Sequence, residues 1–253
     1  QLMKVLALAV PYGSRAAQVA RLLDLKLTRT VTDDEGNYKE IEVLDYDKGS
    51  YYRNTYLNTY PGLKKLMLKS EIDATTSGKV RTRVGRIRHL EYAQFVGGLL
   101  RKAGIDSDSF LDFPSRKLEM EEIPELGLTK NGLVEFSRKF DIPMWRIKEG
   151  GNWGYVRSYY RNQVNNAVNF RVQGMVAHLT NRALVEINRA LKTSGIDGYA
   201  VLTVYDSIVL YVEECRAEDA CILLKDAMEN NIYAKLVSIP MIAEPSIKDT
   251  LDD

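Results

Sequence analysis

The chain has 253 residues, of which 45% are hydrophobic, and its 35 basic and 34 acidic side chains leave a net charge of +1 at pH 7. This length is sufficient for one large domain or two smaller ones, and no apolar run approaches the roughly 18 residues of a membrane span. We therefore expect no membrane association. Neither cysteine belongs to a metal-binding spacing, which favours a reduced cytoplasmic protein, in bacteria or in a phage-infected host.

The first seventy residues combine helical and extended patterns. Apolar spacing predicts a helix over 15–27, and alternation predicts a strand over 38–47 after the turn residues DDEGNY. The segment 51–72 has the pattern of two helices separated by Pro61-Gly62.

The segment 76–90 is basic and predicts a hairpin. We expect Ser77-Gly78 to form its turn and Gly85 to interrupt a strand. Its stretch KVRTRVGRIR contains five basic residues and no acidic one. Such a run is often only a solvated surface, but it is also the chemistry that contacts nucleic-acid phosphates.

The last hundred residues indicate helix, hairpin, helix and strand. A long helix is predicted over 157–193, strands over 199–205 and 208–214, a helix over 217–230 and a strand over 236–243. The second half of the long helix has one apolar face, formed by Val172, Val176, Leu179, Ala183, Ile187 and Leu191. The fold class expected from this order is α+β with an antiparallel sheet.

One carboxylate, Asp206, lies between the two strands in AVLTVYDSIVLYVEE. Asp is common in turns because its side chain bonds nearby amides, so a purely structural role is one interpretation. The other is a ligand to Mg²⁺, which prefers carboxylate oxygens together with substrate phosphates. A single acid does not complete such a site.

The N-terminal segment KVLALAVPYG offers groups that suit a nucleotide. Lys4, Leu8 and Tyr12 are spaced along one helix face, and Gly13 follows. Lys can contact phosphates and an aromatic ring can stack on a base. Taken alone, such residues are more often ordinary surface and core.

Together these segments resemble the family A DNA polymerases, the group of bacterial DNA polymerase I and its phage relatives. The Lys-to-Tyr-Gly spacing resembles the family's motif B, and VYDS resembles motif C at the tip of the palm hairpin. Three further matching segments lie between them in the family's order, namely YPGLKKLM (60–67), GKVRTRVGRIR (78–88) and NFRVQGMVAHL (169–179).

The resemblance implies a mostly helical fingers region plus part of a palm. By it, Lys4, Leu8, Tyr12 and Gly13 bind the incoming dNTP, with Lys4 on the triphosphate, and Asp206 holds catalytic Mg²⁺. It also implies a set of primer-template contacts at Asn169, Gln173, Tyr205, Arg81, Arg86 and Arg88.

Several positions depart from the family pattern. Tyr205 replaces a His, Ser207 replaces a Glu, Leu8 replaces an aromatic residue and Asn165 replaces an Arg. Motif A, which carries the second essential aspartate, has no counterpart here. The expectation is therefore a split polymerase, in which a separate N-terminal polypeptide supplies motif A.

Two other functions remain open. A fragment of a single-subunit RNA polymerase shares the Lys-to-Tyr-Gly spacing and a Ser after the motif C Asp. A non-catalytic DNA-binding subunit would explain the replacements at Tyr205 and Ser207. The domain organisation we expect is fingers over 1–92 with an insertion at about 28–55, an atypical insertion over 93–156, and a palm half over 157–253.

Overall fold

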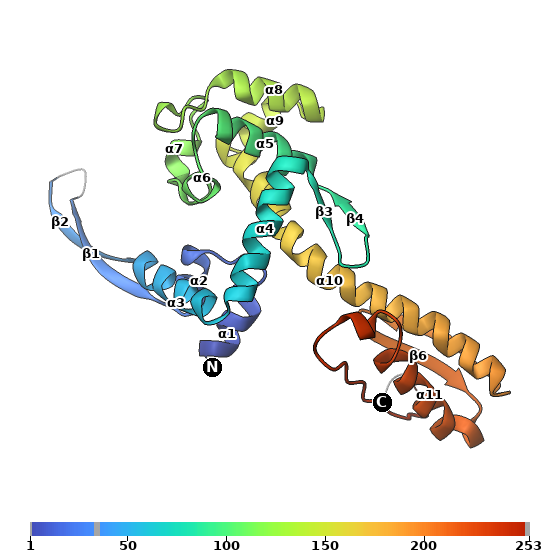
Figure 1. Ribbon diagram of the computed structural model, residues 1–253. Coiled ribbons are helices and arrows are strands. Elements are labelled where there is room, and N and C mark those ends of the chain that lie inside the picture. The colour runs from blue at the N-terminus through green and yellow to red at the C-terminus, as the bar shows by residue number, and fades with distance from the viewer. Residues whose placement is uncertain (1, 33–35, 251–253) are drawn as a thin grey trace. The chain divides into compact units, whose positions relative to one another are not determined.

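The computed structural model describes residues 2–32 and 36–250, so part of the predicted DDEGNY turn lies outside the described residues. The chain divides into two compact units (Figure 1): residues 1–80 with 87–170, and residues 81–86 with 171–253. The division falls within one helix and differs from the functional boundaries expected at 92 and 156, which stay predictions. No described helix has both the length and the apolar character needed to cross a membrane.

The first unit is mainly helical and carries one small hairpin and most of the strand residues of a second, whose residues 81–86 belong to the second unit. Its elements in chain order are α1 (Leu2–Ala9), α2 (Ala16–Leu22), β1 (Lys26–Thr32), β2 (Tyr38–Leu44), α3 (Tyr46–Thr59), α4 (Pro61–Ser77), β3 (Lys79–Arg81), β4 (Ile87–His89), α5 (Glu91–Lys102), α6 (Ser107–Asp112), α7 (Ser115–Leu118), η1 (Pro124–Leu126), α8 (Lys130–Phe140), α9 (Met144–Glu149) and the first part of α10 (Trp153–Thr193). The second unit contains the rest of α10, β5 (Gly198–Val204), β6 (Ser207–Val212), η2 (Glu214–Arg216), α11 (Ala217–Glu229) and η3 (Ala234–Leu236).

Most of the expected elements are present, including β2, the α3–α4 pair, α10, the β5–β6 hairpin and α11. The helix expected over 15–27 is too long: α2 ends at Leu22, and Asp24 adopts a left-handed φ of 50° before β1 begins. That turn is required because β1 pairs along its length with β2, from Lys26↔Leu44 to Thr32↔Tyr38.

The hairpin of the basic segment turns later than expected. Ser77 is the last residue of α4, and Gly78 ends that helix with a left-handed φ of 66°. The chain reverses instead between Thr82 and Arg86. There the Thr82 amide donates to the Arg86 carbonyl at 2.9 Å, and the Arg86 amide donates to Thr82 Oγ1 at 3.1 Å.

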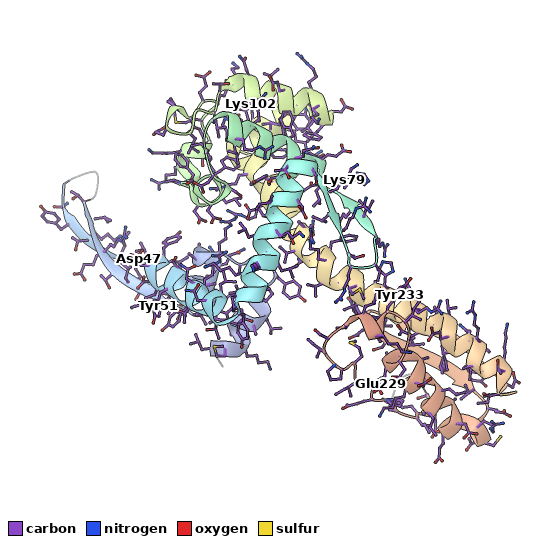
Figure 2. All side chains as sticks on the ribbon, viewed as in Figure 1. Asp47, Tyr51, Lys79, Lys102, Glu229 and Tyr233 are labelled. Carbon is purple, nitrogen blue, oxygen red and sulfur yellow. The ribbon has the colours of Figure 1, made fainter. Side chains whose placement is uncertain are left out.

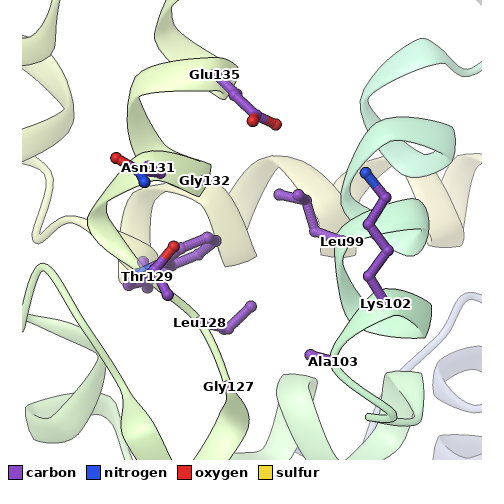
Figure 3. Close-up of a pocket in the computed structure, with 10 residues that line it drawn as sticks. Leu99, Lys102, Ala103, Gly127, Leu128, Thr129, Asn131, Gly132 and Glu135 are labelled. Carbon is purple, nitrogen blue, oxygen red and sulfur yellow. The ribbon is translucent and has the colours of Figure 1, made fainter.

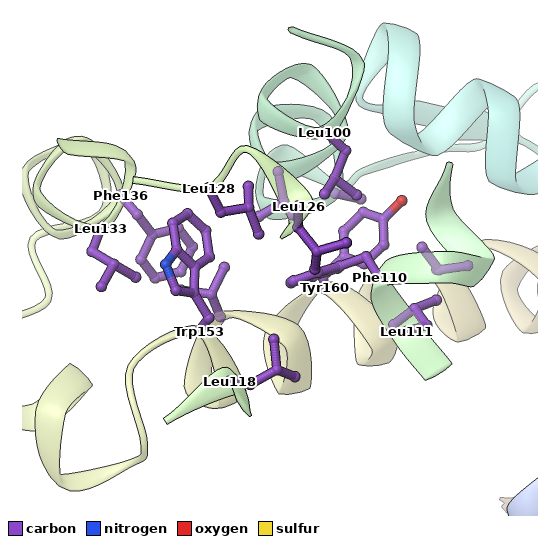
Figure 4. Close-up of a cluster of buried hydrophobic side chains, with 14 of the residues drawn as sticks. Leu100, Phe110, Leu111, Leu118, Leu126, Leu128, Leu133, Phe136, Trp153 and Tyr160 are labelled. Atoms are coloured by element: carbon purple, nitrogen blue, oxygen red, sulfur yellow. The ribbon is translucent and has the colours of Figure 1, made fainter. Parts of the chain in front are cut away.

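The core of the first unit comes largely from residues 93–156, the predicted insertion. Its largest buried side chains include Phe110, Phe136, Trp153 and Tyr160 (Figure 4). The Trp153 indole also donates to the Glu121 carbonyl at 3.0 Å, which satisfies its buried polar atom. This segment is therefore an integral part of the unit's core and not a loop on its surface.

In the second unit, one face of the β5–β6 hairpin packs in a core with side chains of α10 and α11. Ile187, Leu191, Ile208 and Ala220 belong to that core. The apolar face predicted for α10 is buried from Leu179 onward, whereas Val172 is 50% exposed.

The strand expected over 236–243 is wrong, because this segment has no strand pairing. Pro240 lacks the N–H that a sheet ladder needs. The Ala243 amide instead donates to the carboxylate of Glu229 at 2.7 Å, and buried Asn231 accepts from the amides of Tyr233 and Ala234, both at 3.0 Å. Glu229 and Tyr233 are labelled in Figure 2. Side-chain bonds therefore organise the chain after α11.

Candidate functional site

The helix α1 presents Lys4 and Leu8 to solvent, and Leu8 is 63% exposed. Leu6 is buried in a small core with Val19 of α2. The single helical face expected from Lys4 to Tyr12 is wrong beyond Ala9, where α1 ends. Tyr12 lies in the turn that follows and is 48% exposed, so its ring is accessible although it is not on the helix.

Gly13 brings this turn against α10. Its φ of 90° is left-handed, and a Cβ built there would lie 2.2 Å from Oδ1 of Asn165. The turn is closed by the Gly13 amide, which donates to the Val10 carbonyl at 3.0 Å. The left-handed backbone therefore favours glycine here, and a larger residue would also displace the side chain of Asn165. Sequence reasoning noted Asn165 only as a departure from the family pattern and missed this contact.

Asp206 and Tyr205 form the two-residue connection between β5 and β6, because Val204 pairs with Ser207. The expected position of Asp206 in a tight turn is confirmed. Tyr205 has a φ of 54°, which is uncommon for a bulky residue, and its side chain is 94% exposed. The turn thus presents an aromatic ring and a solvent-facing carboxylate together at the tip of the hairpin.

The outer face of this hairpin is apolar and uncovered within its unit. It carries Tyr199, Leu202, Val204 and Tyr211, which are 57%, 47%, 45% and 66% exposed, and the two tyrosine rings lie 5.8 Å apart. Exposed apolar patches of this kind mark interaction surfaces, and a two-stranded sheet leaves both edges unpaired. Strict alternation in the sequence could have indicated this face, but a bulge between Ala200 and Leu202 interrupts the period.

The expected primer-template residues are distributed along α10 and the β3–β4 hairpin. Asn169 is half-buried and Gln173 is exposed, one helical turn further along. The Arg88 guanidinium lies over the ring of Phe170, 5.9 Å from its centroid, which holds this arginine beside the Asn169 turn of α10. Arg81 and Arg86 are exposed on either side of the Thr82 turn.

The two units divide the predicted site residues between them. The first unit carries Lys4, Leu8, Tyr12, Gly13, Arg88 and Asn169, and the second carries Arg81, Arg86, Gln173, Tyr205 and Asp206. Their assembly into one site stays a prediction.

The donor set for Mg²⁺ is incomplete within the described part of the chain. Over residues 2–32 and 36–250, no group of three or more His, Cys, Asp or Glu side chains is placed to hold a metal ion. Asp206 fits the chemistry of one Mg²⁺ ligand, because it is a solvent-facing carboxylate with room for further oxygen ligands.

A small cavity of about 200 Å³ lies between α5 and α8 (Figure 3). Leu99 and Lys102 line one side, and Gly132 and Glu135 the other, with Trp153 against Gly132. Ligand pockets usually exceed about 300 Å³. None of the predicted site residues lines this cavity, so it does not contribute to the candidate site.

The chain is similar to known DNA polymerases. The model of DNA polymerase family A matches residues 131–253. DNA polymerase I of Pseudomonas aeruginosa is 25% identical over 174 residues, which are 65% of this chain and 18% of that protein. The thermostable DNA polymerase I of Thermus filiformis is 31% identical over 166 residues, or 62% of this chain and 18% of that protein. The chain thus spans less than a fifth of the length of these relatives.

The fold is similar to that of the POL domain of Pol1 from M. smegmatis, solved in complex with DNA primer-template and dNTP. The TM-score is 0.55 at 15% sequence identity, and the match covers 90% of this chain and 27% of that one. The mostly helical α+β architecture expected from the sequence is therefore confirmed.

Proposed function

We propose that this chain is part of the polymerase region of a family A DNA polymerase and that it binds dNTP and DNA primer-template in template-directed DNA synthesis. The match of the family model to residues 131–253 and the similarity to DNA polymerase I of Pseudomonas aeruginosa support this. Lys4, Leu8, Tyr12 and Gly13 bind the nucleotide. The observation that carries the proposal is the hairpin tip, where Asp206 is exposed in a two-residue turn, within a VYDS stretch that resembles motif C.

The remaining predicted residues act on the nucleic acid. Asn169 and Gln173 donate to minor-groove acceptors, which every base pair offers. Tyr205 contacts the primer-template beside Asp206, and Arg81, Arg86 and Arg88 position phosphates. We place the reaction in the cytoplasm of a bacterium or a phage-infected host.

Asp206 is this chain's ligand to Mg²⁺, which when bound stabilises the charge that develops on the transferred phosphoryl group. A second carboxylate is needed, and we propose that a separate N-terminal polypeptide supplies it on a motif A strand. The uncovered apolar face at Tyr199, Leu202, Val204 and Tyr211 supports this, because such a strand would cover it. In this proposal residues 1–92 act as fingers and 157–253 as half of the palm, with insertions at about 28–55 and 93–156.

The test is primer extension by the chain alone and by the chain with its partner polypeptide. We expect extension only in the mixture, and Asp206→Asn should lower it by ~10²-fold or more, the scale of losing one charge-stabilising group. Asp197→Asn is the matched control, since Asp197 is exposed at the opposite end of the same hairpin.

Three results would contradict parts of the proposal. Extension by the chain alone excludes the need for a partner. Full activity of Asp206→Asn in the mixture would show that Asp206 has only a structural role in the turn, and would favour a non-catalytic DNA-binding subunit. Incorporation of rNTP in preference to dNTP favours the RNA polymerase alternative.

A further inference from the structure

Four arginine side chains gather around the C-terminal end of α6 in the first unit. They are Arg15, Arg53, Arg157 and Arg161. Arg15 immediately precedes α2, Arg53 lies on α3, and the other two lie one turn apart on α10. Segments distant in sequence thus form one positively charged cluster.

The acids nearest to this cluster are at its solvent side. Arg15 Nη1 lies 2.5 Å from Asp108 Oδ1 and 3.7 Å from Asp112 Oδ2. The Arg15 side chain is only 12% exposed, whereas the two carboxylates are 69% and 58% exposed. Solvent screens exposed carboxylates, so their attraction compensates buried guanidinium groups poorly.

Two of these side chains, Arg53 and Arg161, have N–H donors beyond the hydrogen bonds that they make to backbone carbonyls. A guanidinium carries five N–H donors. Arg161 Nη2 donates to the Leu111 carbonyl at 3.0 Å, while its Nε is buried without a hydrogen-bond partner among the described residues. Arg53 Nε donates to the Ser14 carbonyl at 3.2 Å, in the turn that carries Tyr12 and Gly13.

Burial lowers the pKa of Arg53, Arg157 and Arg161, and neighbouring arginines lower it further. Arg15 acts in this way on Arg53 and Arg161, and Arg161 acts on Arg157. The attraction of Asp112 raises the pKa of all three arginines and so opposes this lowering. At Arg53, Asp108 and Glu71 act in the same direction as Asp112. A desolvated group of like charges is costly unless an anion joins it.

We propose that this arginine cluster binds a phosphate group, from the backbone of a nucleic-acid strand or from a nucleotide. Guanidinium groups match phosphate oxygens with paired hydrogen bonds. In the free protein, Asp108 stands in for the phosphate at Arg15, and an arriving phosphate displaces it. The inference rests on the proposed function, since it places this contact next to the Tyr12-Gly13 turn.

The experiment measures binding of a labelled single-stranded DNA to the chain by fluorescence anisotropy at several salt concentrations. Arg53→Gln should weaken binding by about tenfold and reduce the slope of log K against log salt by about 0.7, the value for one lost single-strand phosphate contact. Arg138→Gln is the matched control, because Arg138 is an exposed arginine on α8 of the same unit, and it should leave affinity and slope unchanged.

A second variant tests the displaced carboxylate. Asp108→Asn should raise the affinity for the DNA, and Glu135→Gln, at an exposed acid on α8, should not.

Competition with dATP and with inorganic phosphate identifies the source of the phosphate group that the arginine cluster binds. Displacement of the DNA by dATP at concentrations where inorganic phosphate fails points to the nucleotide, and resistance to both points to the strand.

Folding is checked by urea unfolding without DNA. Arg53→Gln should unfold at or above the wild-type midpoint, because it removes a repelled buried charge, whereas a purely structural cluster predicts a lower midpoint. Equal weakening by Arg53→Gln and Arg138→Gln, or no weakening by either, overturns the inference. Failure of the proposed function is distinct, because then the wild-type chain itself binds no DNA.

Discussion

Gly49 of α3 is the point where this helix touches the backbone of α2. A Cβ at Gly49 would lie 2.2 Å from the Ala16 carbonyl oxygen and 3.0 Å from the Ala20 Cβ. Side-chain Cβ atoms essentially never approach within 3.0 Å, so Gly49→Ala requires the helices to separate by at least the 0.8 Å difference. The obstacle is main chain and cannot rotate away, unlike a flexible side chain.

The expected free-energy change combines two opposing effects. Overpacking of this kind costs about 1–3 kcal/mol. Alanine is better than glycine in a helix by about 1 kcal/mol, which offsets part of the loss. We therefore expect Gly49→Ala to lower the free energy of unfolding by up to about 2 kcal/mol, a fall in Tm of up to about 8 °C for a unit of this size.

Thermal unfolding followed by far-UV circular dichroism measures this change, and Gly62→Ala is the matched control. Gly62 lies in the first turn of α4, where a Cβ would meet nothing within 4 Å. That substitution should be neutral or stabilising by up to about 1 kcal/mol. Equal stability of the two variants would refute the reasoning, since the close approach of α3 to α2 would then impose no constraint.

Two further predictions concern the core of the first unit. Trp153→Phe should lower the free energy of unfolding, measured with urea, by about 2–3 kcal/mol, because it leaves the Glu121 carbonyl unpaired and a space in the core. The control is Trp145→Phe, at a 65% exposed tryptophan, which should change this free energy by no more than about 0.5 kcal/mol. Burial raises the pKa of Tyr160 from 10.0 to about 12, so its stabilisation is complete below pH 10 and lost as the pH rises through 12. Tyr160→Phe should therefore lose less stability over that interval than the wild type; equal losses would contradict this.

The sequence by itself determined the main elements that carry chemistry. Helical periodicity predicted α10, and two apolar runs around a polar pair predicted the β5–β6 hairpin with Asp206 in its turn. These are local properties, because hydrophobic period and turn chemistry act over a few residues. The family resemblance likewise depended on short motifs in order, and the match over residues 131–253 agrees with it.

Where elements end was decided by contacts between distant segments. The helix over 15–27 stopped at Leu22 because Lys26 pairs with Leu44, and the pattern at 236–243 did not form a strand because its backbone bonds Glu229 instead. Neither partner is visible in a local window. Local hydrophobic patterns therefore predicted a helix that was too long and a strand that does not form, because tertiary contacts override local preference.

Only the tertiary structure placed Gly13 against Asn165 and left the outer face of the hairpin uncovered. Only the tertiary structure brought together Arg15, Arg53 and Arg161, which come from three segments distant in sequence and share no motif. The physical reason is that burial and charge compensation depend on every neighbour in space. The sequence specifies which side chains are charged, and the packing of the helices determines which of these side chains are buried.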